Sequence, residues 1–227
     1  MSMTVKPTPV PDEEAFAALK AGIDTLPPGV KMFLNSGGCG SSCLRHLDIV
    51  PDSSRGPQSH APSFLYTFSA EFYGHGLTTA NLELLARFFD RYPEYAERTF
   101  LSVKGGTIPG QMVSDGSREN LRRSVDAVLK ALRGTKRLDL FEPARRESNY
   151  EIEHYAEVLN EMVKEGKFDY IGLSEVNADT VRRAHKVSYG TFLCWCTSVL
   201  CDELGCARRG GRDRSEPSSL RATNERW

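Results

Sequence analysis

The chain has 227 residues, of which 40% are hydrophobic and 26% are charged, a composition typical of a soluble globular domain. Its net charge of -1 and pI near 6.5 argue against a general electrostatic mode of nucleic-acid binding. We find no apolar run near the roughly 20 residues that span a bilayer, and the first residues lack the apolar core of a secretory signal. We therefore expect a cytoplasmic protein without membrane or nucleic-acid partners.

Hydrophobic periodicity predicts helices and strands in alternation along the chain. Amphipathic helices are expected over residues 12–26, 78–89, 117–132, 150–165 and 179–185, and short buried strands over residues 30–35, 99–103, 137–141 and 170–174. Thr79 and Ser117 are predicted N-caps, and Gly166 is predicted to end the fourth helix. Strands that recur about every thirty residues between helices indicate parallel βαβ units.

The fold class we predict is α/β, a (β/α)8 TIM barrel rather than a doubly wound sheet. No glycine-rich GxGxxG follows the first strand. The polar residues Asn35, Lys104 and Ser174 all come at the carboxyl ends of predicted strands, where such barrels keep their sites. A complete barrel typically needs about 250 residues, so we expect an incomplete one of about four strand–helix units within residues 1–186.

Two segments do not follow the alternation. Residues 38–70 have no periodicity and are rich in Ser, Pro, Gly and Arg, and we interpret them as an atypical insertion, such as a retained intron translated in frame. Residues 187–227 begin apolar and become rich in Arg, Gly and Ser, and we expect them to form an atypical, disordered tail. Cys194, Cys196, Cys201 and Cys206 lie there, but their spacing lacks the paired knuckles of a zinc site, so no metal is expected.

The chemistry is predicted from Tyr73, in Glu71-Phe72-Tyr73-Gly74, and from Lys104 at a strand end. An ammonium group near a phenol favours the phenolate, which makes the tyrosine a better proton donor to a carbonyl that is being reduced. Each residue also has a structural interpretation. Tyr73 could be a packing residue, Lys104 a surface lysine and Asn35 a turn cap. Ser174 could satisfy the strand end or cap the next helix, and we expect Glu71 to be structural.

These motifs resemble those of the aldo-keto reductase family. Joining residues 34–37 directly to residues 71–74 gives Leu-Asn-Ser-Gly-Glu-Phe-Tyr-Gly, which is similar to the segment that bears the family's catalytic tyrosine. Residues 101–106 resemble the strand with the catalytic lysine, and residues 168–174 the strand that meets the nicotinamide carboxamide. Asn35 replaces the family's aspartate and Ala144 its histidine, substitutions that are similar to those of the fungal pyridoxal reductases.

The resemblance implies reduction of an aldehyde, pyridoxal to pyridoxine, by hydride transfer from NADPH, a step of vitamin B6 metabolism. Tyr73 would donate the proton, Lys104 would tune it, and Asn35 would hold Lys104 by a hydrogen bond. Ser174 would bind the cofactor, and Arg145 would meet a substrate phosphate or hydroxyl. Two alternatives remain: a truncated or mis-spliced fragment without activity, and a binding module that uses the arginine-rich tail from Arg208 to Arg226.

Overall fold

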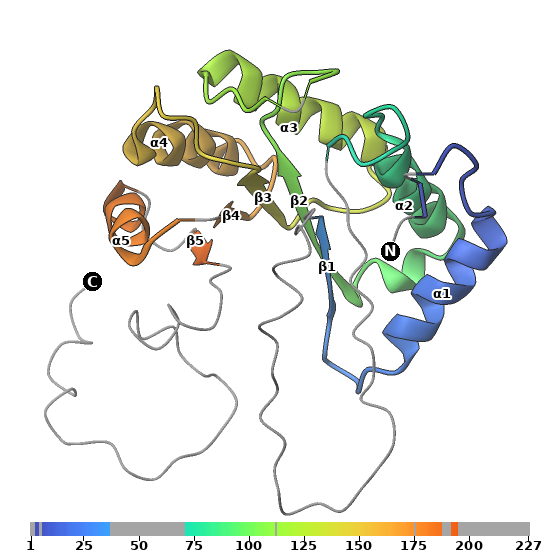
Figure 1. The fold of residues 1–227 in the computed structure, drawn as a ribbon. Helices are drawn as coiled ribbons and strands as arrows, with labels where there is room; N and C mark the ends of the chain where they lie inside the picture. Colours follow the sequence, from blue (N-terminus) through green and yellow to red (C-terminus); the bar gives the residue numbers. More distant parts are fainter. Residues whose placement is uncertain are drawn as a thin grey trace, which may run out of the picture. The chain divides into compact units, whose positions relative to one another are not determined.

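The structure is a computed structural model that describes residues 3–4, 6–36, 71–111, 113–174, 176–187 and 192–194 (Figure 1). The described helices are α1 (Asp12–Asp24), α2 (Ala80–Arg91), α3 (Arg118–Leu132), α4 (Ile152–Lys164) and α5 (Ala178–Val187), with a 3-10 turn at Pro93–Tyr95. The described strands are β1 (Met32–Ser36), β2 (Thr99–Gly105), β3 (Leu140–Pro143), β4 (Tyr170–Leu173) and β5 (Phe192–Cys194). The predicted insertion over residues 38–70 lies outside the described residues.

The five described strands form one parallel sheet in the order β1-β2-β3-β4-β5, so every strand pairs with its neighbour in sequence. Figure 1 shows α2 to α5 along one face of this sheet, and consecutive helices pack against each other. A doubly wound sheet would reverse its strand order and carry helices on both faces. The arrangement is therefore that of a (β/α) barrel segment, which confirms the predicted fold class and its four strand–helix units.

The helix ends follow the predicted signals. The Ser117 hydroxyl accepts a hydrogen bond from the Asn120 backbone at the start of α3, as expected of an N-cap. Gly166 follows α4 with a φ of +77°, a conformation that glycine adopts without steric cost. Thr79 occupies the N-cap position of α2, but its hydroxyl donates to the Glu83 carboxylate instead of capping the backbone.

The core lies between the helices and the sheet, as the amphipathic patterns predict. Phe16 of α1 packs on Phe88 of α2, with ring centroids 5.6 Å apart, and Tyr92 and Tyr95 complete the cluster. The apolar faces of α3 and α4 are likewise buried. Burial of these side chains stabilises the fold by roughly 1.5–3 kcal/mol each relative to leaving them exposed.

The sheet continues past α5 with β5, which pairs with β4 in parallel register from Ile171↔Phe192 to Leu173↔Cys194. These three residues lie in the range that we expected to be a tail without regular structure. The apolar start of this range supplies the three residues of β5, and the expectation of a disordered tail stays a prediction for the rest of the range. The other residues from 188 onward lie outside the described part of the chain.

Alternation along the strands decides which side chains face away from the helices. A Cβ built on Gly105 would lie 2.4 Å from Oγ of Ser124 on α3 and 2.7 Å from the Phe141 ring, so these positions face the helices. Successive side chains of a strand point to opposite faces. Lys104 precedes Gly105, Glu142 follows Phe141, and Lys104 and Glu142 are partners in the β2–β3 register. Both side chains therefore project to the face of the sheet opposite the helices.

Candidate active site

Lys104 and Ser174 meet at the carboxyl edge of the sheet. Lys104 Nζ donates a hydrogen bond of 3.0 Å to Ser174 Oγ, although the two residues are 70 positions apart in sequence. The lysine belongs to β2 and the serine follows β4, so the side chain reaches across the end of β3. Only 16% of the Lys104 side chain is exposed, which excludes the interpretation of Lys104 as a solvated surface lysine.

Ser174 does not cap the helix that follows it. The first turn of α5 is instead capped by Asn177, whose Oδ1 accepts hydrogen bonds of 2.9 Å from both the backbone N–H and the hydroxyl of Thr180. Ser174 thus remains at the sheet edge, where its hydroxyl oxygen accepts a hydrogen bond from Lys104 Nζ. The sequence offered helix capping as one role for Ser174, and the structure gives that role to Asn177, whereas the contact of Ser174 with Lys104 was not foreseen.

Glu142 lies beside Lys104 on the same face of the sheet. The two residues are partners in the β2–β3 register, and Lys104 Nζ is 3.9 Å from Glu142 Oε1. The Glu142 side chain is 2% exposed, and its Oε1 has no hydrogen-bond partner among the described residues. Burial raises the pKa of the Glu142 carboxyl to about 7, against the opposing effect of the Lys104 charge.

A glycine makes room for this carboxyl. A Cβ built on Gly172 of β4 would lie 2.7 Å from both Glu142 Cβ and Leu140 Cδ2, closer than real atoms approach. The sheet therefore needs glycine at this position so that Glu142 can lie between β2 and β4.

Tyr73 lies in a segment that is attached to β2. The Glu71 N–H donates to the Lys104 carbonyl at 2.8 Å, which places the start of the segment at the end of the lysine's strand. The Tyr73 N–H donates to Oδ1 of Asn81 on α2 at 3.3 Å, and the Tyr73 carbonyl accepts from the Thr4 hydroxyl at 2.9 Å. The backbone of the half-buried tyrosine is thus held from two sides. Tyr73 lies two residues after Glu71, whose N–H is hydrogen-bonded to the Lys104 carbonyl.

Glu71 is structural, as predicted. Its buried carboxylate accepts from Arg123 Nη1 at 2.5 Å and from the Ser124 hydroxyl, both on α3. Ser124 also accepts the Gly106 N–H at 2.8 Å, and Arg123 donates to the Thr107 carbonyl at 2.8 Å. The network joins the tyrosine segment, the turn after β2 and α3 into one hydrogen-bonded unit.

The two other predicted site residues are placed less completely. Asn35 pairs with Ser102 in the β1–β2 register, near the carboxyl end of β1, but its side chain lies outside the described part of the chain. Its proposed hydrogen bond to Lys104 therefore stays a prediction. Arg145 is exposed and lines an open depression of about 300 Å³ together with Arg146, Ser174, Val176, Asn177 and Thr180.

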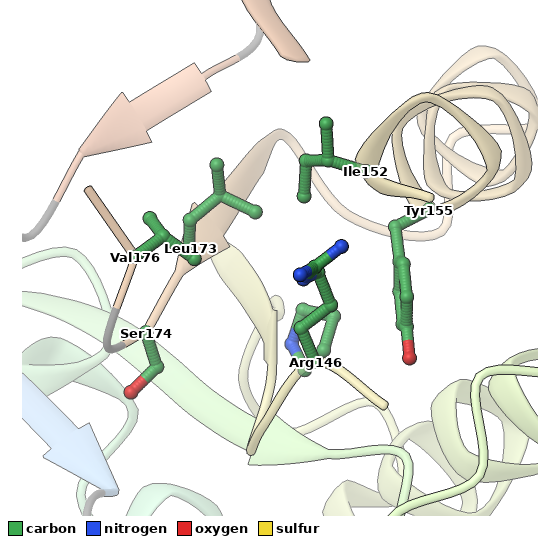
Figure 2. A pocket seen from close by; sticks show the side chains of 7 residues that line it. Arg146, Ile152, Tyr155, Leu173, Ser174 and Val176 are labelled. Carbon is green, nitrogen blue, oxygen red and sulfur yellow. The ribbon is translucent and has the colours of Figure 1, made fainter. Parts of the chain in front are cut away.

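A second, smaller cavity of about 10 Å³ lies next to this depression, large enough for about one water molecule. Figure 2 shows Arg146, Ile152, Tyr155 and Leu173 around it. The Ser174 hydroxyl points away from Ile152 and Tyr155 in this view. The serine oxygen therefore belongs to the lysine side of the sheet edge rather than to the small cavity.

Within the described ranges, no group of three or more His, Cys, Asp or Glu residues is arranged to hold a metal ion. Of the four C-terminal cysteines only Cys194, in β5, is described, and the arginine-rich tail lies outside the described residues. A search of the described helices found none long and apolar enough to cross a membrane.

Comparison with known proteins adds the family. The model of the Aldo/keto reductase family matches residues 68–195, more than half of the chain. The chain belongs to the aldo/keto reductase family. It is 43% identical over 119 residues to "Probable pyridoxal reductase 2" of Schizosaccharomyces pombe, an alignment that covers 52% of this chain and 36% of that protein. It is 32% identical over 178 residues to "Aldo-keto reductase yakc [NADP(+)]" of the same yeast, covering 74% of this chain and 48% of the relative.

Among solved structures, the thermostable aldo-keto reductase Tm1743 matches with a TM-score of 0.50 and 18% sequence identity. The match covers 83% of this chain and 52% of that one, and it supports the aldo-keto reductase fold. The chain spans half or less of the length of the two curated relatives named above.

Sequence reasoning about this aldo-keto reductase missed Glu142. A signal for it was present, since Leu140-Phe141-Glu142-Pro143 places one charged residue in an apolar strand that is buried at every position. Fully buried acidic side chains are rare unless they are paired. The contrast within the strand could have singled out this residue.

Proposed function

We propose that this chain carries the reaction centre of an NADPH-dependent aldehyde reductase that converts pyridoxal to pyridoxine, with Tyr73 as the proton donor. The observation that carries the proposal is the 3.0 Å hydrogen bond between Lys104 and Ser174 at the carboxyl edge of the sheet. The carboxyl edge is where barrel enzymes keep their sites. The attachment of the Tyr73 segment to the Lys104 backbone, through Glu71, supports it further.

In the proposed reaction the aldehyde carbon gains a hydride and the aldehyde oxygen gains the proton of the Tyr73 hydroxyl, so that an alcohol forms. NADPH, when bound, supplies the hydride and leaves as NADP⁺. Lys104 stabilises the phenolate that remains on Tyr73, because an ammonium group favours the charged form of a nearby phenol. A solvent proton then restores the hydroxyl. General acid catalysis of this kind contributes typically 10²–10⁴-fold to a rate.

The donors at the sheet edge fit a nicotinamide carboxamide. Ser174 Oγ accepts its hydrogen bond from Lys104, which leaves the serine's own hydrogen for a carbonyl acceptor. The serine lines the open depression, so a cofactor amide has access to it from solvent. The choice of NADPH rests on the relative whose name includes NADP(+).

Pyridoxal is proposed as the substrate because a relative that is 43% identical over 119 residues is named a probable pyridoxal reductase. Arg145 lies at the same depression as Ser174, and its guanidinium is suited to a phosphate or hydroxyl group on the ring of such a substrate. Ala144, which has no acid–base group, leaves the proton transfer to Tyr73 in this proposal.

Steady-state kinetics of the full 227-residue chain test the proposal, with NADPH oxidation followed at high cofactor concentration in the presence and absence of pyridoxal. Tyr73→Phe is expected to lower kcat about 10²–10⁴-fold. Tyr170→Phe is the matched control, since Tyr170 is a partly exposed tyrosine at the opposite, amino end of β4. Pyridoxal-dependent turnover that is equal in Tyr73→Phe and the unmutated chain, or absent from the unmutated chain, would overturn the proposal.

A further inference from the structure

A buried carboxyl group, that of Glu142, lies beside Lys104 of the candidate site on the adjacent strand. Glu142 is 1% exposed, and its Oε1 has no hydrogen-bond partner in the part of the chain that the structure describes. Burial of an acidic group without partners is unfavourable, so such a group persists where a nearby charge or a function requires it. The proposed reaction, as described above, makes no use of it.

Among the described residues, Lys104 is the charged group that acts on the Glu142 carboxyl. From β2 it is faced by Lys104, with Nζ 3.9 Å from Oε1. From β4 it is faced by Gly172, which has no side chain. The neutral Ser174 is the first residue after β4. Lys104 is the charge that opposes the burial effect on the carboxyl. The side chain of Asn35, near the end of β1, lies outside the described residues.

We propose that Glu142 is the positioning residue and counter-ion of Lys104: its carboxyl group holds the ammonium at the end of β2, where the ammonium also donates to Ser174. The role assigned to Lys104 rests on the proposed function. Because the register pairs the two residues on adjacent strands, the contact is built into the sheet rather than into a mobile loop. Gly172 keeps the space that the carboxyl occupies.

The pair has a consequence for the reaction. When Glu142 is ionised, its charge balances that of Lys104, and when it is protonated, a positive charge faces the site. The pKa of about 7 for the Glu142 carboxyl means that this balance changes near neutral pH. Under the proposed function, the ionisation of Glu142 thereby changes the charge beside the lysine that tunes Tyr73.

Carbon-13 NMR of the full chain, labelled at the glutamate side-chain carboxyls, tests the pairing without cofactor or substrate. A resonance that is lost in Glu142→Gln identifies the group, and it is expected to titrate with a midpoint of about 7. Lys104→Met should raise this midpoint by about one pH unit or more, because an opposite charge at this distance favours the ionised carboxyl. Lys104→Arg keeps the charge and should leave the midpoint nearly unchanged, and Lys130→Met, on the last turn of α3, is the remote control.

Each outcome decides the proposal separately from the reductase function. A midpoint that is equal in the unmutated chain and in Lys104→Met, or one near the ordinary value of 4.5, overturns the pairing even if pyridoxal is reduced. A coupled midpoint supports the pairing even if Tyr73→Phe shows that the reductase proposal is wrong. In an active chain we also expect the rate to change near neutral pH as Glu142 ionises. Glu142→Gln should abolish this change, whereas replacing a residue that serves packing alone would leave it in place.

Discussion

Replacement of Glu142 by glutamine should make the fold more stable at neutral pH. Burial raises the pKa of this carboxyl from 4.5 to about 7 in the folded chain. Between these values the folded chain holds a proton that the unfolded chain has lost, so the free energy of unfolding falls as pH rises. At 1.36 kcal/mol for each pKa unit, the raised pKa costs about 3 kcal/mol above pH 7.

The glutamine side chain is neutral at every pH and has nearly the shape of the protonated acid, so Glu142→Gln removes this cost. The variant should exceed the unmutated chain in unfolding free energy by less than about 1 kcal/mol at pH 5 and by about 3 kcal/mol at pH 8. Urea unfolding of both chains at the two pH values measures the difference, and differences between variants cancel the titration of all other groups.

Glu161→Gln is the matched control for this experiment. Glu161 is a carboxylate on the surface of α4, and hydrogen bonds from Arg118 and Arg122 lower its pKa. It is ionised in the folded and the unfolded chain between pH 5 and 8, so its replacement should shift stability almost equally at both values. If Glu142→Gln behaved like this control, the carboxyl would not be buried as the structure has it, and the reasoning would be refuted.

Three further predictions concern the supports of the site and its cofactor. Glu71→Ala should lower the free energy of unfolding by about 3 kcal/mol, because it leaves Arg123 without its buried partner. Glu83 is exposed, and Glu83→Ala is the control that should cost less than about 0.5 kcal/mol. Equal urea midpoints of the two variants would contradict this prediction. Gly172→Ala should cost about 1–3 kcal/mol in the same assay, since the new methyl group would meet Glu142 at 2.7 Å, and an unchanged midpoint would mean that the sheet yields there. Calorimetric titration of the 227-residue chain should find NADPH binding weaker than micromolar, because the depression beside Ser174 is open and of only about 300 Å³; micromolar affinity would refute this.

Much of the fold follows from local patterns. The run from Thr99 to Val103 is apolar enough to be recognised as a buried strand, and β2 spans Thr99–Gly105. Ser117 caps α3 through a hydrogen bond from a backbone N–H three residues on, and Gly166 ends α4 with a positive φ, both as predicted. Both signals are local in the sequence. The absence of a glycine-rich fingerprint favoured the barrel, and the consecutive strand order agrees.

The candidate site was predictable only in part. Lys104 and Ser174 were selected because they follow apolar strands, and the structure brings them within 3.0 Å of each other. The same local argument left Ser174 as a possible helix cap, a role that Asn177 fills. It also left β5 out, since three apolar residues carry too little pattern to distinguish a strand from a tail.

The sequence by itself determined the elements, the parallel α/β class and the family motifs, because periodicity, caps and short motifs are local properties of the chain. Only the tertiary structure decided that Lys104, Glu142 and Ser174 meet across β2, β3 and β4. The physical reason is register, since a shift of one residue between neighbouring strands would turn each of these side chains to the opposite face. Burial of Glu142 then follows from that register and from the glycine at 172, and it gives the carboxyl its raised pKa.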